Sequence, residues 1–128
     1  MSLQLARAQA EEIAERIAGL GPVAVTRFFS GAGLVLEGVQ FAFVIAGSLY
    51  LKVDDETRPQ FEAAGAAPFS YSGPKKQVVV TSYYETPASV LEEDDTLTAW
   101  AADAVGAARR TQAKKPKRAR QPKAAKSS

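Results

Sequence analysis

Positive charge is gathered at the C-terminal end of the chain, where it could bind phosphate groups. Residues 109–128 carry nine basic side chains and no acidic one. Such cations bind nucleic acid by replacing its counterions, without reading base sequence. We therefore predict a non-specific DNA contact through Arg109, Arg110, Lys114, Lys115, Lys117, Arg118, Arg120, Lys123 and Lys126.

Two other interpretations of this segment stay open. Alanine is its only apolar residue type and it holds two prolines, so we expect a disordered tail over residues 109–128. Residues 1–108 hold seven basic and all 14 acidic side chains, a net charge of −7 against +9 for the tail. The tail could therefore remain solvated and offset the acidity of residues 1–108, or fold back onto their surface.

Two acidic runs could in principle bind a cation. Asp54-Asp55-Glu56 lies between a predicted strand and a predicted helix, where carboxylates accept the free backbone N–H groups of a first helical turn. The Glu92–Asp95 run likewise precedes a helix and lacks the Asp-x-Asp-x-Asp-Gly order of a calcium loop. We predict helix starts at both places and no metal site.

The side chains that usually perform catalysis are scarce. The chain contains no histidine and no cysteine, and its serines form no G-x-S-x-G motif. The glycines of Ser30-Gly31-Ala32-Gly33 stand between two strands rather than before a helix, so we predict a turn or a bulge and not a phosphate loop. We expect no enzymatic activity and no cofactor.

An arginine beside two aromatic residues can form a protein-binding edge. Arg27 and Phe28 are our candidate interaction residues on this ground, although one of Phe28 and Phe29 must belong to the core.

The elements that position these residues begin with a helix over Ser2–Ala18. Its apolar residues recur at steps of three and four and make one stripe. They are Leu3, Ala6, Ala10, Ile13, Ile17 and Leu20. Four short apolar runs then predict strands over Val23–Phe29, Leu34–Leu36, Val39–Ile45 and Leu49–Val53, joined by turns at Ser30–Gly33, Glu37-Gly38 and Ala46–Ser48.

A short helix is expected over Asp55–Ala64. Thr57 and Gln60 could form a capping box with Pro59 harmless in the first turn, or Asp55 could be the cap. A hairpin of Phe69–Ser72 and Gln77–Tyr84 follows, and then a helical stretch over Pro87–Ala108 with a break near the second acidic run. Its inward face is Leu97, Trp100, Ala101, Ala104, Val105 and Ala108.

This order predicts an α+β fold, an antiparallel sheet of about five to six strands with N-terminal, middle and C-terminal helices. We assign Val39, Phe41, Phe43 and Ile45 to one face of the third strand. Ala42, Val44 and Val79 make the second face partly apolar, so the chain itself or a second copy, in a homodimer, could cover it.

Composition limits the class of protein. At 128 residues, 46% hydrophobic and 23% charged, the chain is typical of one globular domain, here residues 1–108. No apolar run approaches the roughly 20 residues of a membrane helix, and no secretory signal precedes the first helix. With no cysteine as well, we expect a cytoplasmic protein without a membrane partner.

The blocks TRFFSGAGLVLEGVQFAFVIAGSLYLKVDDETRPQFEAAGAAPFSYSG, VVVTSYYETPASVL and LTAWAADAV cover most of residues 22–108. They resemble the N-terminal domain of the TfoX/Sxy family of bacterial competence regulators. Where that family typically has Arg-Met-Phe-Gly-Gly, this chain has Arg27-Phe28-Phe29-Ser30-Gly31. The resemblance implies a secretion-chaperone-like α+β fold, standing without the family's helical C-terminal domain.

The resemblance also implies transcriptional regulation of DNA-uptake genes beside a cyclic-AMP receptor protein. Our leading hypothesis is thus a small regulatory protein that binds another protein and touches DNA through its tail. The alternative is a protein-interaction or chaperone-like module with no nucleic-acid role.

Overall fold

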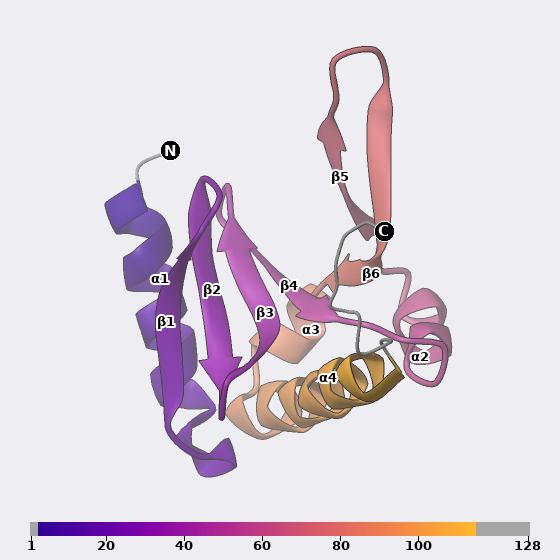
Figure 1. Ribbon diagram of the computed structural model, residues 1–128. Helices are drawn as coiled ribbons and strands as arrows, with labels where there is room; N and C mark the ends of the chain where they lie inside the picture. The colour runs from indigo at the N-terminus through magenta and orange to yellow at the C-terminus, as the bar shows by residue number, and fades with distance from the viewer. Residues whose placement is uncertain (1–2, 115–128) are drawn as a thin grey trace.

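A six-stranded antiparallel sheet with helices on one face makes up the body of the protein (Figure 1). The computed structural model describes residues 3–114. In sheet order the strands are β1 (Val23–Phe28), β2 (Gly31–Leu36), β3 (Val39–Ile45), β4 (Ser48–Lys52), β6 (Gln77–Glu85) and β5 (Pro68–Ser72). The helices are α1 (Leu3–Arg16), α2 (Arg58–Ala63), α3 (Ala88–Leu91) and α4 (Asp94–Lys114), with a 3-10 turn, η1, at Ala18–Leu20. The predicted α+β class is confirmed.

The turns after β2 and β3 are set by local chemistry. Each is a two-residue connection, Glu37-Gly38 and Ala46-Gly47, with φ of +53° and +81° in the first and +53° and +84° in the second. Positive φ at both residues matches the right-handed twist of the neighbouring strands, and glycine adopts it without strain. The glycines at these two places were sufficient signals for the turns.

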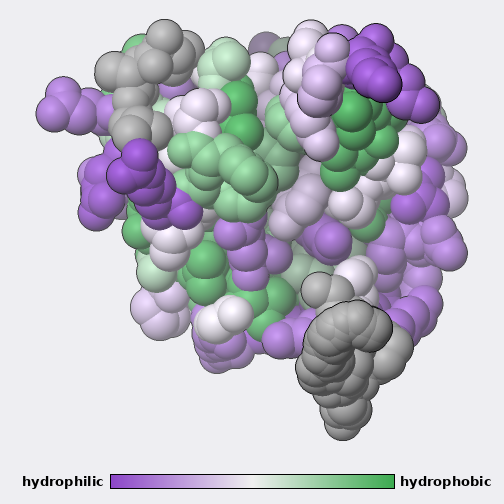
Figure 2. Space-filling view, turned by 45° about the horizontal axis from the view of Figure 1, so that its top comes forward, coloured by the Kyte–Doolittle hydropathy of each residue, from purple (hydrophilic) through white to green (hydrophobic). Residues whose placement is uncertain are grey.

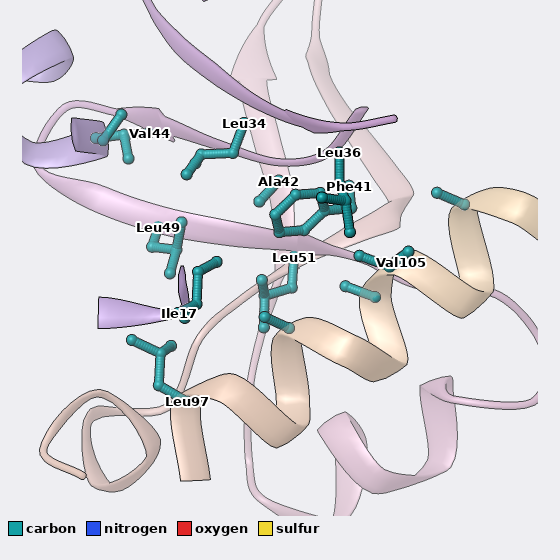
Figure 3. Packing of buried hydrophobic residues seen from close by; sticks show 14 of the residues in the cluster. Ile17, Leu34, Leu36, Phe41, Ala42, Val44, Leu49, Leu51, Leu97 and Val105 are labelled. Atoms are coloured by element: carbon teal, nitrogen blue, oxygen red, sulfur yellow. The ribbon is translucent and has the colours of Figure 1, made fainter. Parts of the chain in front are cut away.

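The main core lies between the sheet and helices α1 and α4 (Figure 3). Helix α1 covers β1 to β3 and α4 covers β3 and β4. Both predicted helical stripes are confirmed, since Ala6, Ala10 and Ile17 of the first and Leu97 and Val105 of the second are buried in one cluster. The small side chains let the helices approach the sheet closely.

A β-bulge in β3 overturns the predicted faces of that strand. Val35 pairs with Gln40 and Leu34 with Ala42, so Phe41 is the extra residue. A bulge shifts the in–out alternation by one residue. Phe41 and Ala42 are therefore both fully buried in the helix-covered core, while Phe43 lies on the other face.

Hairpin β5–β6 extends beyond the rest of the sheet (Figure 1). Strand β6 pairs with β4 only through its last residues, Tyr83–Glu85, whereas its first half, from Gln77, pairs with β5 alone. A second irregularity, between Pro68 and Phe69, accompanies this change of partner. The hairpin is thus an arm attached to the sheet at one end.

The start of α2 follows neither predicted capping arrangement. Thr57 precedes the helix without a side-chain cap, and Pro59 lies in the first turn. The turn is closed instead by Asp54, whose Oδ1 accepts the backbone N–H groups of Glu56 (3.1 Å) and Thr57 (3.2 Å). In return, the Asp54 N–H donates to Thr57 Oγ1 at 3.1 Å.

Helix α4 continues past the predicted end of the domain. We expected a disordered tail from residue 109, but residues 109–114 complete the last turns of the helix. Residues 109–114 are therefore helical and not disordered, because Ala107 and Ala108 are buried against the body and ion pairs, described below, hold the next turn. The remainder of the predicted tail lies outside the described residues.

Candidate interaction surface

The sheet face opposite the helices is filled by an aromatic face, which we define as Phe28, Phe43, Tyr50, Phe69 and Tyr83. Phe43 is its centre. The Phe43 ring centroid lies 4.7 Å from that of Phe28 and 5.0 Å from that of Phe69. Phe69 belongs to β5, so these contacts join the attached end of the hairpin arm to this face of the sheet. Phe43 is buried by its aromatic neighbours, whereas the other four rings stay half-buried.

Two glycines make room for the rings. Gly31 pairs with Phe28 and Gly33 pairs with Phe43, so both glycines share the aromatic face. A Cβ on Gly31 would lie 1.9 Å from the carbonyl oxygen of Val44, closer than any real contact. The predicted turn at Ser30–Gly33 is thus corrected. The turn is Phe29-Ser30, and the glycines lie inside β2, where close packing requires them.

A surface pocket opens where the β1–β2 turn approaches the hairpin arm. We call it the apolar pocket. It has a volume of about 390 Å³ and is lined by Phe29, Ser30, Ile45, Phe69, Ser70 and Tyr71. Four of these six residues carry large apolar or aromatic side chains. Figure 2 views the molecule with the end bearing this turn and the arm brought forward, and hydrophobic residues lie exposed there among hydrophilic ones.

Phe29 is the most exposed large apolar residue of the described chain, at 80%. It is also strained, because its φ of +51° lies in the left-handed region that bulky side chains avoid. Its ring contacts Phe28 edge to face at 4.6 Å. Tyr71, across the pocket, is 49% exposed. Glu37 and Ala46, the first residues of the next two hairpin turns, have almost the same φ, so the turn imposes this conformation on Phe29 and leaves its ring in solvent.

The structure therefore revises the predicted interaction residues. Arg27 is exposed as expected, but Phe28 is half-buried in the aromatic face and its neighbour Phe29 is the one that faces solvent. Sequence reasoning missed Ile45 and Tyr71 as pocket residues. The alternation of Phe69 and Tyr71 was the available signal for β5, but nothing local indicated that the arm reaches the β1–β2 turn.

Two of the predicted nucleic-acid contacts are engaged in the body. Arg110 binds Asp54 in a bidentate pair, Nε to Oδ2 at 2.6 Å and Nη2 to Oδ1 at 3.1 Å, and its Nε lies 3.3 Å from Glu56 Oε2. Arg109 Nη2 lies 2.5 Å from Glu37 Oε1. These pairs join the last turns of α4 to two loops. The Arg110 pair is largely buried and stabilises the fold, whereas the Arg109 pair is exposed and contributes little.

The ion pair with Arg110 changes the pKa of Asp54. The hydrogen bond from Arg110, aided by the backbone N–H groups of Thr57 and Glu56, lowers the pKa of Asp54 to about 2, although partial burial acts in the opposite direction. Its carboxylate already has three or more donors, so this acidic run closes a turn, as predicted. Across residues 3–114, no group of three histidine, cysteine, aspartate or glutamate side chains is placed to hold a metal ion.

Of the remaining predicted DNA contacts, only Lys114 lies within the described residues. Lys114 is exposed in the last helical turn. The others lie outside the described residues, namely Lys115, Lys117, Arg118, Arg120, Lys123 and Lys126.

Tyrosines at the centre of the fold are held neutral. Burial, then the hydrogen bond from Tyr84 Oη to Glu62 Oε2 at 3.1 Å, raises the pKa of Tyr84. Burial also raises the pKa of Tyr83, on the aromatic face. Neither hydroxyl is suited to general-base chemistry near neutral pH.

None of the helices within residues 3–114 has the length and apolar character to cross a bilayer.

The family model described as the TfoX N-terminal domain matches residues 15–108, from the end of α1 to the middle of α4. The matched segment includes every strand, both glycines of β2 and the whole lining of the apolar pocket. No curated protein matches the chain.

Proposed function

Because the chain belongs to the TfoX N-terminal domain family, we propose that it is a small regulatory protein that acts by binding another protein. The observation that carries this proposal is the apolar pocket beside the strained, 80% exposed Phe29. Exposed aromatic side chains around a preformed pocket are typical anchors of protein interfaces. The role we propose is non-enzymatic and cytoplasmic.

We propose further that the basic residues after Arg110 add non-specific affinity for DNA. Arg109 and Arg110 are engaged with acidic residues of the body, which leaves Lys114 and the six cations beyond it for this contact. Each phosphate neutralised by such a side chain releases about one counterion, so the contact would weaken steeply with salt. A transcription regulator, such as a cyclic-AMP receptor protein, is the kind of partner that fits a DNA-associated role.

Fluorescence anisotropy of a labelled DNA duplex, titrated with the full chain across a salt series, tests the DNA contact. The informative variant replaces Lys117, Arg118 and Arg120 with glutamine. A matched control replaces three body cations, Arg7, Lys75 and Lys76, with glutamine, which changes the net charge equally. We expect the first variant to bind less tightly and to lower the slope of log affinity against log salt by up to about 2.7.

Equal weakening by both variants would show that net charge alone matters and would remove the tail's specific role. Absence of binding at low salt would favour the second candidate, a protein-interaction or chaperone-like module with no nucleic-acid role. The apolar pocket supports that candidate equally well, since nothing in its chemistry requires DNA. Light scattering on the same samples would detect a homodimer.

A further inference from the structure

We propose that strand β5 and the apolar pocket bind an extended segment of a partner protein, which adds as a strand to β5 and places an aromatic or large aliphatic side chain in the pocket. Acidic residues of that segment would lie toward Lys75 and Lys76. The inference rests on the proposed protein-binding role and specifies its site and its partner's chemistry.

The first support is the free edge of the sheet. Among the described strands, β5 pairs with β6 alone, so it forms one edge of the six-stranded order. An edge strand presents unpaired backbone N–H and C=O groups, which an extended peptide can bind by adding a strand. Ser70 and Tyr71, in the middle of β5, also line the apolar pocket. Backbone pairing and side-chain insertion would therefore occur side by side.

The second support is the pocket's shape and rigidity. Its volume of about 390 Å³ is at the small end of the range for ligand sites, which suits one or two side chains rather than a large cofactor. Phe69, which lines the pocket, is held by Phe43 and Tyr50, with ring centroids 5.0 Å and 4.9 Å away. A wall residue fixed by the aromatic face does not need to be ordered on binding, which favours affinity.

The third support is charge. The three stretches that line the pocket lie within residues 16–36, 38–53 and 63–84, and none of these contains an acidic residue. Lys75 and Lys76, in the loop of the hairpin arm, are both exposed. Arg27 is also exposed, but it shares the helix-covered face of β1 with Val23 and Val25 and so lies on the face opposite the pocket. The nearest acid along β6, Glu85, accepts a hydrogen bond from Ser48 Oγ at 3.1 Å.

The three stretches that line the pocket therefore carry only positive charge, although residues 1–108 have a net charge of −7. Complementary charge steers association and selects partners. An acidic segment is favoured, and the chain's own basic residues 109–128 are disfavoured as the occupant because like charges would meet.

The experiment selects random 12-residue peptides displayed on phage against the immobilised full chain. Enriched sequences are then made as fluorescein-labelled peptides, and their dissociation constants are measured by anisotropy. We expect enriched peptides to alternate apolar and polar residues, with one aromatic or large aliphatic anchor flanked by aspartate or glutamate.

Two variants remove the site while keeping the fold. Phe29→Gly suits the positive φ of that turn, and Tyr71→Ser changes a residue that is 49% exposed. The matched control is Val79→Ser, because Val79 is 55% exposed on β6 but does not line the pocket. We expect both site variants to weaken peptide binding more than tenfold and the control to change it less than twofold. Circular dichroism of each variant confirms that the fold is kept.

Four results would overturn the proposal. Three of them are a selection without enrichment, enriched peptides that are basic, and peptides that bind the site variants as tightly as the original chain. Light scattering that showed a dimer dissociated by Phe29→Gly would overturn it too, because a second copy would then occupy the pocket. DNA affinity of the same variants, measured in parallel, separates failure of this inference from failure of the proposed DNA contact.

Discussion

The ion pair between Arg110 and Asp54 makes the sharpest quantitative prediction. The Asp54 side chain is 11% exposed and its pKa is about 2, against an ordinary value of 3.8. At about 1.36 kcal/mol per pKa unit, this difference corresponds to about 2.4 kcal/mol of folding free energy above pH 5. Water reaches the Arg110 side chain, which is 35% exposed, so we expect between about 1 and 2.4 kcal/mol to be lost in Asp54→Asn.

The pH dependence has a defined sign. Because the folded pKa of Asp54 lies below the unfolded value, its contribution is present above the unfolded pKa and is lost as pH falls through the folded pKa near 2. About half of the pH 7 contribution should remain at pH 3. Urea denaturation of the original chain and of Asp54→Asn, at pH 7 and at pH 3, measures the two differences in the free energy of unfolding.

The neighbouring arginine provides the control. Arg109 pairs with Glu37, but these side chains are 51% and 70% exposed, so Arg109→Gln should cost less than about 0.5 kcal/mol. Arg110→Gln should cost about as much as Asp54→Asn, because it leaves a largely buried carboxylate without its main partner. Equal small losses in the two arginine variants, or an effect of Asp54→Asn that does not change with pH, would refute the reasoning.

Three further outcomes can be checked by denaturation. Gly31→Ala should lower the free energy of unfolding by about 3 kcal/mol or more, because its Cβ would lie 1.9 Å from the Val44 carbonyl oxygen. Gly19→Ala is the control for the same thermal melts. It should be nearly neutral, because nothing lies within 4 Å of a Cβ at that position. Phe43→Ala should lower the free energy of unfolding, measured in urea, by about 3–5 kcal/mol, since Phe43 is 2% exposed and central to the aromatic face. A loss below about 1 kcal/mol would contradict that position. The raised pKa of Tyr84 predicts that stability is full below pH 10 and falls as pH rises further, a decline that Tyr84→Phe should reduce.

Much of the fold could be predicted because its signals are local. The stripe that buries Ala6, Ala10 and Ile17 follows from the period of the helix alone. The turns at Glu37-Gly38 and Ala46-Gly47 follow from the tolerance of glycine for positive φ. Strand ends were correct to within one or two residues, except in β2, where glycines inside the strand were taken as a turn.

The candidate interaction surface was predicted only in part. Arg27 and the aromatic pair beside it were found from residue types, but the sequence did not show that Phe29 is the exposed ring and that Phe28 packs on Phe43. That choice depends on where β1 ends and which face β2 leaves empty. Two glycines in β2 leave room on the second face, and Phe28 fills it, so Phe29 falls in the turn and faces solvent.

The sequence alone thus determined the helices, the hairpins and the separation of charge, because each depends on residues a few positions apart. The tertiary structure decided the rest. A single extra residue, Phe41, reversed the faces of half of β3, and the hairpin arm brought Phe69 onto Phe43. In the sequence, Arg110 belongs to the basic C-terminal segment, but the fold places it beside Asp54, 56 positions earlier. Such contacts leave no periodic trace in the sequence, since they join segments whose separation is set only when the core packs.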